Sequence, residues 1–80
     1  MERLKKAKEE IGLTIRNTLG NAPSKVFYNQ VDRIINECAD IPSLERGCSR
    51  LISIANLFIG EDKAKEIKRN CSKILENIAA

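Results

Sequence analysis

Apolar residues recur every three to four positions along almost the whole chain, and this spacing most limits what the chain can fold into. Residues with that spacing share one face of a helix, whereas strand residues of one face alternate with those of the other. Such alternation is never sustained in this sequence. The pattern therefore predicts four amphipathic helices, at about residues 2–19, 24–39, 43–59 and 62–78.

Short breaks that contain helix-ending residues separate the four segments. Gly20 suits the left-handed position after a helix, and Pro23 disfavours helical geometry in the residue before it. Asp40 or Ser43 can cap the start of the third segment, and Gly60 ends it. Because such short connections join antiparallel neighbours, we expect one all-α domain over residues 1–80, a small bundle of about four antiparallel helices arranged as two helical hairpins.

The third segment has the widest apolar face. Its arc of roughly 160° exceeds the stripe that a surface helix needs, so we expect this helix to be central in the bundle. The residues of the arc are Leu44, Cys48, Leu51, Ile52, Ala55, Phe58 and Ile59. The first segment contains Gly12 in its middle and is the least secure helix, which could instead project and pair with a second copy of the chain.

The cysteines are predicted to be core residues. Cys38, Cys48 and Cys71 each fall on the apolar face of a predicted helix, where a thiol behaves as a small hydrophobic group. Their number is odd, no Cys-x-x-Cys pair occurs, and the chain lacks histidine, so we expect neither a metal site nor a disulfide framework. Free buried thiols favour a reducing, cytoplasmic setting.

The sequence contains no recognisable set of catalytic groups. The absence of histidine excludes histidine-assisted serine or cysteine catalysis. Most carboxylates occupy polar helical positions, where they balance nearby lysines, and no glycine-rich phosphate loop is present. We therefore expect a protein that is not an enzyme and that carries no cofactor.

Several apolar residues fall outside the main stripes of their helices. These candidates for a partner interface are Leu13, Val26, Ile54 and Leu57. A chain of 80 residues has a small core, and exposed apolar patches mark interaction sites. We expect a helical protein–protein interaction or oligomerisation module with a regulatory or adaptor role, most simply a homodimer. The alternative is a tightly folded monomer in which the other helices surround the third.

Basic residues suggest a second function, the binding of nucleic acid. Rows that could contact phosphates occur on the third and fourth segments: Arg46, Arg50, Lys65, Arg69 and Lys73. Glu66 and Glu76 dilute the charge of the fourth segment, and 14 basic residues against 11 acidic ones give a net charge of only +3. We therefore rank this function second.

Membrane binding is not expected. The basic start of the first segment lacks the aromatic residues of an interfacial helix, and the longest apolar run is too short to span a bilayer.

Overall fold

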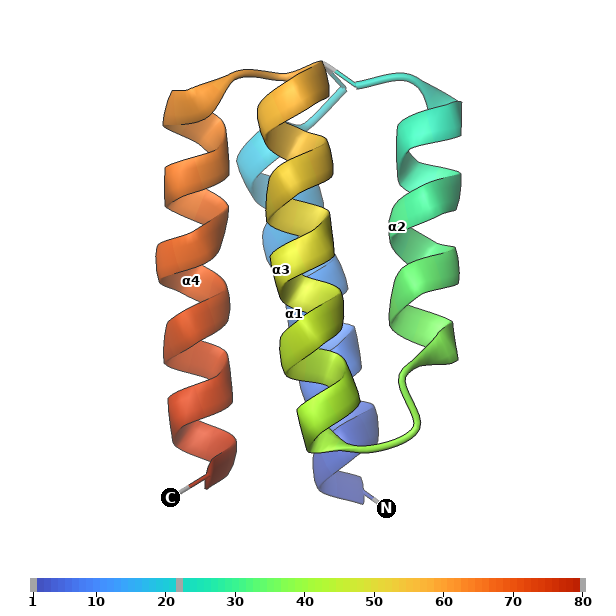
Figure 1. Ribbon diagram of the computed structural model, residues 1–80, viewed down its shortest axis with the longest axis vertical. Coiled ribbons are helices and arrows are strands. Elements are labelled where there is room, and N and C mark those ends of the chain that lie inside the picture. Colours follow the sequence, from blue (N-terminus) through green and yellow to red (C-terminus); the bar gives the residue numbers. More distant parts are fainter. Residues whose placement is uncertain (1, 22, 80) are drawn as a thin grey trace.

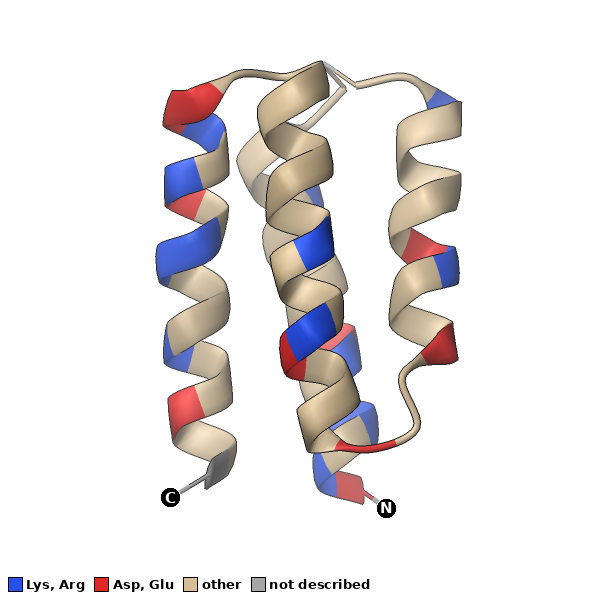
Figure 2. Cartoon of the chain, in the orientation of Figure 1, with Lys and Arg blue, Asp and Glu red and all other residues tan. Residues whose placement is uncertain are grey.

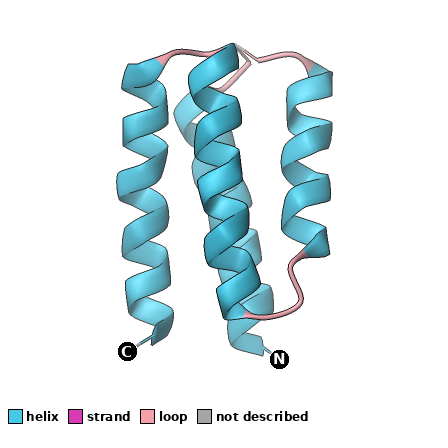
Figure 3. Cartoon of the chain, viewed as in Figure 1, coloured by secondary structure: helices cyan, strands magenta, loops and turns pink. Residues whose placement is uncertain are grey.

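Four helices make up nearly all of the computed structural model, which describes residues 2–21 and 23–79. They are α1 (Glu2–Leu19), α2 (Lys25–Glu37), α3 (Ile41–Phe58) and α4 (Glu61–Ala79). No strand occurs among these residues, as Figure 3 shows. The prediction of a small all-α bundle is therefore confirmed.

The helices run up and down beside one another. The α1–α2 and α3–α4 connections lie at one end of the bundle, and both chain ends lie at the other (Figure 1). Helix α1 packs against α2 and α4, and α3 packs against the same two helices. Helix α1 thus completes the bundle within its own chain, so its projection toward a second copy, which the sequence left open, is not observed.

Capping residues set the helix boundaries. The Asp40 carboxylate accepts a hydrogen bond of 2.8 Å from the Ser43 amide, which makes Asp40 rather than Ser43 the N-cap of α3. Helix α3 consequently begins two residues earlier than the predicted position 43. Helix α2 ends at Glu37, before the predicted position 39, because the backbone of Cys38 is already extended. Helix α4 begins directly after Gly60, whose φ of 120° suits glycine.

One continuous core lies between the helices. It includes all three cysteines, as the sequence predicts, and no polar or charged residue is buried in the described part of the chain. Its most completely buried large side chains are Phe27, Ile11, Ile15, Leu44, Ile67, Val31 and Cys71. The hydrophobic effect thus accounts for the association of the four helices without a buried polar network.

Helix α3 is not central, and the prediction that it would be is wrong. Its main packing partners are α2 and α4, and its outer side, which carries the exposed Leu57, faces solvent. Within the predicted apolar arc, Leu44, Cys48, Leu51 and Ala55 are buried, whereas Phe58 is exposed. In a square arrangement each helix has two neighbours, and part of an unusually wide apolar face remains uncovered.

Candidate protein-interaction surface

Four large apolar side chains are exposed in the described part of the chain. Their exposed fractions are 61% for Leu13, 59% for Val26, 83% for Leu57 and 58% for Phe58. Ile54, which the sequence also proposes as a contact residue, is half-buried and packs against the core. Leu13, Val26 and Leu57 therefore lie outside the core, as their positions on the helices predict, whereas Ile54 lies at its edge.

Three of the proposed contact residues lie on the neighbouring helices α2 and α3 near one end of the bundle: Val26, Ile54 and Leu57. Val26 is in the first turn of α2 and Leu57 is in the last turn of α3, and these antiparallel helices pack together. Phe58 adds to this region, since its ring makes an edge contact with Phe27 of α2 at a centroid distance of 6.0 Å. We call Val26, Ile54, Leu57 and Phe58 the α2–α3 patch.

A shallow groove continues from this patch along the two helices. Its lining residues are Gln30, Arg33, Ile34, Glu37, Arg50 and Ile54. Ile54 belongs to both the patch and the groove, and Val26 precedes Gln30 by one helical turn. The surface is therefore apolar toward the start of α2 and becomes charged toward the other end.

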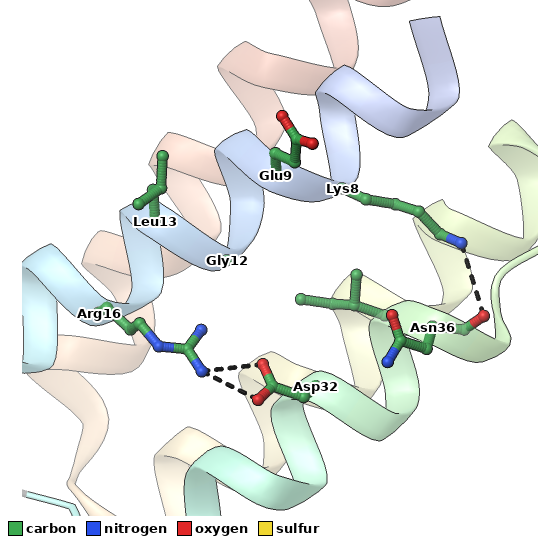
Figure 4. Close-up of a pocket in the computed structure, with 8 residues that line it drawn as sticks. Lys8, Glu9, Gly12, Leu13, Arg16, Asp32 and Asn36 are labelled. Atoms are coloured by element: carbon green, nitrogen blue, oxygen red, sulfur yellow. Dashed lines mark hydrogen bonds and ion pairs between the residues drawn. The ribbon is translucent and has the colours of Figure 1, made fainter. Parts of the chain in front are cut away.

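Leu13 belongs to a different surface. It lies on α1, which packs against α2 and α4, and it borders a groove between α1 and α2. In Figure 4, Lys8 and Arg16 extend from α1 toward α2, whereas Leu13 and Glu9 project from the other side of the α1 ribbon. The structure thus does not bring Leu13 together with the α2–α3 patch.

Polar contacts close part of the α1–α2 groove. The Arg16 guanidinium donates to both carboxylate oxygens of Asp32, at 2.9 and 3.0 Å (Figure 4). It also lies 5.0 Å from the centre of the Tyr28 ring. The Tyr28 hydroxyl in turn donates to the carbonyl of Gly20. Because these groups engage one another, they serve to hold α1 on α2 rather than to bind a ligand.

The basic rows lie on the adjacent helices α3 and α4 (Figure 2). Lys65 is paired with Glu61 at 3.2 Å, and Arg46 donates to the Ser43 hydroxyl. Over residues 2–21 and 23–79, neither Arg50 nor Arg69 makes an ion pair, and the same holds for Lys73. Both helices also carry acidic residues, so the basic side chains do not form a field of one sign.

Cys38 and Cys48 are chemically quiet thiols, whereas the hydrogen bond with Cys48 lowers the pKa of Cys71 against the opposing effect of its burial. Burial raises the pKa of Cys38, whose Sγ donates to the carbonyl of Ile34 at 3.1 Å. The hydrogen bond with Cys71, and then burial, raise the pKa of Cys48. A thiol that stays protonated is a poor nucleophile and a poor metal ligand. Among the described residues, no group of three or more His, Cys, Asp or Glu side chains could hold a metal ion.

Sequence reasoning missed two features of this surface. Phe58 lies within the apolar arc of its helix, so periodicity places it in the core, and its position in the last turn is the only signal for exposure. Arg33 is the second feature: it follows Val26 by seven residues, and this spacing, which the sequence shows, puts both on one face of α2.

Comparisons with protein families, with curated proteins and with solved structures find no match to this chain. None of the described helices is long and apolar enough to cross a membrane.

Proposed function

We propose that the chain is a non-catalytic helical protein–protein interaction module, with a regulatory or adaptor role, that binds its partner through the α2–α3 patch. The observation that carries this proposal is Leu57, which is 83% exposed on a helix whose other face is buried. Phe58 and Val26, each more than half exposed, lie at the same end of the bundle. The free buried thiols favour a reducing, cytoplasmic setting for this function.

Removal of this apolar surface from water would drive the association. Three side chains exposed by more than half present an apolar area on the order of a few hundred Å², which is the size of functional patches on small proteins. Burial yields roughly 25 cal/mol per Å², so the patch can anchor a complex of ordinary interface size. The charged groove beside it would then form the polar rim.

A second copy of the chain is the partner that the sequence favours, and the solution mass tests it. Size-exclusion chromatography with light scattering over a concentration series should give a mass near twice 9.0 kDa if the chain is a homodimer. Leu57→Asp should then reduce the mass to that of a monomer, because it places a charge in the buried contact. Leu13→Asp makes the same change on α1 and should leave association unchanged.

Two outcomes would contradict this scheme. Association that Leu57→Asp leaves unchanged would remove Leu57 from the interface. A monomer at every concentration would reject the homodimer and leave only a different protein as partner.

Nucleic-acid binding is the second candidate, favoured by the unpaired Arg50, Arg69 and Lys73 on adjacent helices in the described part of the chain. A fluorescence titration with mixed-sequence duplex DNA at low salt tests it. If this candidate is right, replacing Lys65, Arg69 and Lys73 by glutamine should weaken binding and flatten its salt dependence. Absence of any affinity at low salt rejects it.

A further inference from the structure

We propose that the α2–α3 patch and its groove bind an amphipathic helix of another protein whose apolar stripe is flanked by acidic residues. This inference rests on the proposed interaction function and adds the chemistry of the partner. It follows from the order of apolar and basic side chains along the two helices.

The charge of the groove selects the flanking residues of the partner. Arg50 lies beside Ile54 and makes no ion pair among the described residues. Arg33 faces Glu37 at 3.5 Å, yet its side chain remains 81% exposed, so this pair leaves most of the guanidinium available.

Arginines in this position suit a carboxylate partner. A guanidinium can donate two parallel hydrogen bonds to one carboxylate, and it is less strongly hydrated than an ammonium group. Arg33 and Arg50 lie on opposite sides of the same groove, since one belongs to α2 and the other to α3. A helix that lies between them would therefore meet a basic side chain on each flank.

The shape of the surface fits a helix as occupant. Two antiparallel helices form the groove, and helix-in-groove recognition uses apolar anchors at positions i, i+3 or i+4, and i+7. From Arg50 to Leu57 the surface extends over seven residues, or about 10 Å at the helical rise of about 1.5 Å per residue. A partner helix of three to four turns would cover both the apolar end and the basic end.

The same charges disfavour the other occupants. In a twofold contact whose axis passes through the groove, the groove arginines of the two copies would lie close together, and like charges in an interface are costly. A duplex nucleic acid presents mainly its charged phosphate backbone to a convex protein surface, so it would leave Leu57 and Phe58 largely uncovered.

Two synthetic peptides of about fourteen residues test the proposal. Both carry leucine at i, i+3, i+7 and i+10, and the flanking positions hold glutamate in one peptide and lysine in the other. Fluorescence anisotropy measures their binding to the wild-type chain. We expect the glutamate peptide to bind, the lysine peptide to bind about tenfold more weakly or not at all, and added salt to reduce the difference.

Three variants separate the contributions of basic and apolar side chains to peptide binding. Arg50→Glu should weaken the glutamate peptide about tenfold and improve the lysine peptide. Lys68→Glu makes the same charge change in the α3–α4 groove and should leave both affinities unchanged. Leu57→Asp should abolish binding of both peptides. All three residues are exposed, and far-ultraviolet circular dichroism confirms that each variant keeps its helix content.

The outcomes distinguish this inference from the proposed function. Equal binding of the two peptides, or indifference to Arg50→Glu, would overturn the acidic preference while leaving an apolar interaction site. A Leu57-dependent dimer that binds neither peptide would identify a second copy as the occupant and overturn the inference. Peptide binding that does not depend on Leu57, or no binding and no dimer, would reject the proposed function as well.

Discussion

At the scale of single residues, Gly47 shows how closely α2 and α3 approach. A Cβ atom added to Gly47 would lie 2.9 Å from Cys38 Sγ and 3.3 Å from Ile34 Cγ2, both in the core. Overpacking of this kind costs about 1–3 kcal/mol, which exceeds the helix propensity that alanine gains. We therefore expect Gly47→Ala to lower the free energy of unfolding, measured by urea denaturation.

Gly12 provides the matched control within another helix. A Cβ at this position would make ordinary contacts, 3.7 Å from Arg16 Nη1 and 4.0 Å from Ile35 Cδ1. Gly12→Ala should therefore raise the free energy of unfolding by about 1 kcal/mol through helix propensity alone. If both variants changed stability in the same direction, the close packing at Gly47 would not be the cause.

The sequence predicts which face of its helix a residue occupies, but not how far that residue lies from a neighbouring helix. Periodicity correctly places Cys38, Cys48 and Cys71 in the core, because each belongs to the apolar stripe of its helix. It cannot distinguish Gly12 from Gly47, since that difference depends on where two helices touch. The sequence misplaces Phe58 for the same reason: its face is apolar, but at the end of α3 the side chain stays 58% exposed despite its edge contact with Phe27 of α2.

At the scale of an element, the start of α3 depends on one carboxylate. The hydrogen bonds from Ser43 hold the pKa of Asp40 below its usual value of 3.8. A lowered pKa in the folded state means that this contribution to stability is fully present above the unfolded pKa. It is lost as the pH falls through the folded pKa, when the acid becomes protonated in the folded chain too.

Asp40→Asn keeps a side chain that can cap α3 but removes its negative charge. Asparagine also caps helices, so this variant should keep α3 intact but lose the part of the acid sensitivity that Asp40 causes. Thermal unfolding followed by circular dichroism between about pH 6 and pH 2 should show a smaller fall in Tm than for the wild type. Asp40→Ala should lower Tm at neutral pH. Parallel curves of Tm against pH for the wild type and Asp40→Asn would show that the charge of Asp40 contributes nothing to the acid sensitivity.

Local residues predict some helix boundaries of this chain and leave others open. The sequence offers Asp40 and Ser43 as alternative caps, and the choice depends on backbone geometry that composition does not reveal. Gly20 and Gly60 are less ambiguous, because both adopt positive φ, at 58° and 120°, where other residues are strained. The predicted boundaries are consequently wrong by two residues at the start of α3 and at the end of α2, and lie within one residue of the observed ones beside Gly20 and Gly60.

At the scale of the whole molecule, the core and the α2–α3 patch both consist of aliphatic and aromatic side chains, which the fold covers in the core and leaves mostly exposed in the patch. Short connections predict antiparallel neighbours, and this is enough to predict a bundle. They do not predict which side of α3 is left uncovered, because that depends on how four helices share one core. The apolar residues outside the main stripes of their helices therefore predict an interface, but not which of them form one surface.

A comparison of two variants tests whether the patch is dispensable for folding. Val26→Gln/Leu57→Gln changes two exposed side chains, and glutamine is at least as good a helix former as either. We expect the free energy of unfolding to stay within about 0.5 kcal/mol of the wild type. Leu51→Ala, at a side chain only 2% exposed, should lose about 2–5 kcal/mol through the cavity it leaves.

The measurement is urea denaturation of both variants at a concentration where the wild type is monomeric. That condition matters because binding or association adds apparent stability by mass action. A loss in the double variant as large as that of Leu51→Ala would mean that the patch supports the fold itself. An unchanged fold together with lost partner binding would instead mean that Val26 and Leu57 are retained for a contact outside the chain, since exposed apolar side chains contribute little to the stability of an isolated helix bundle.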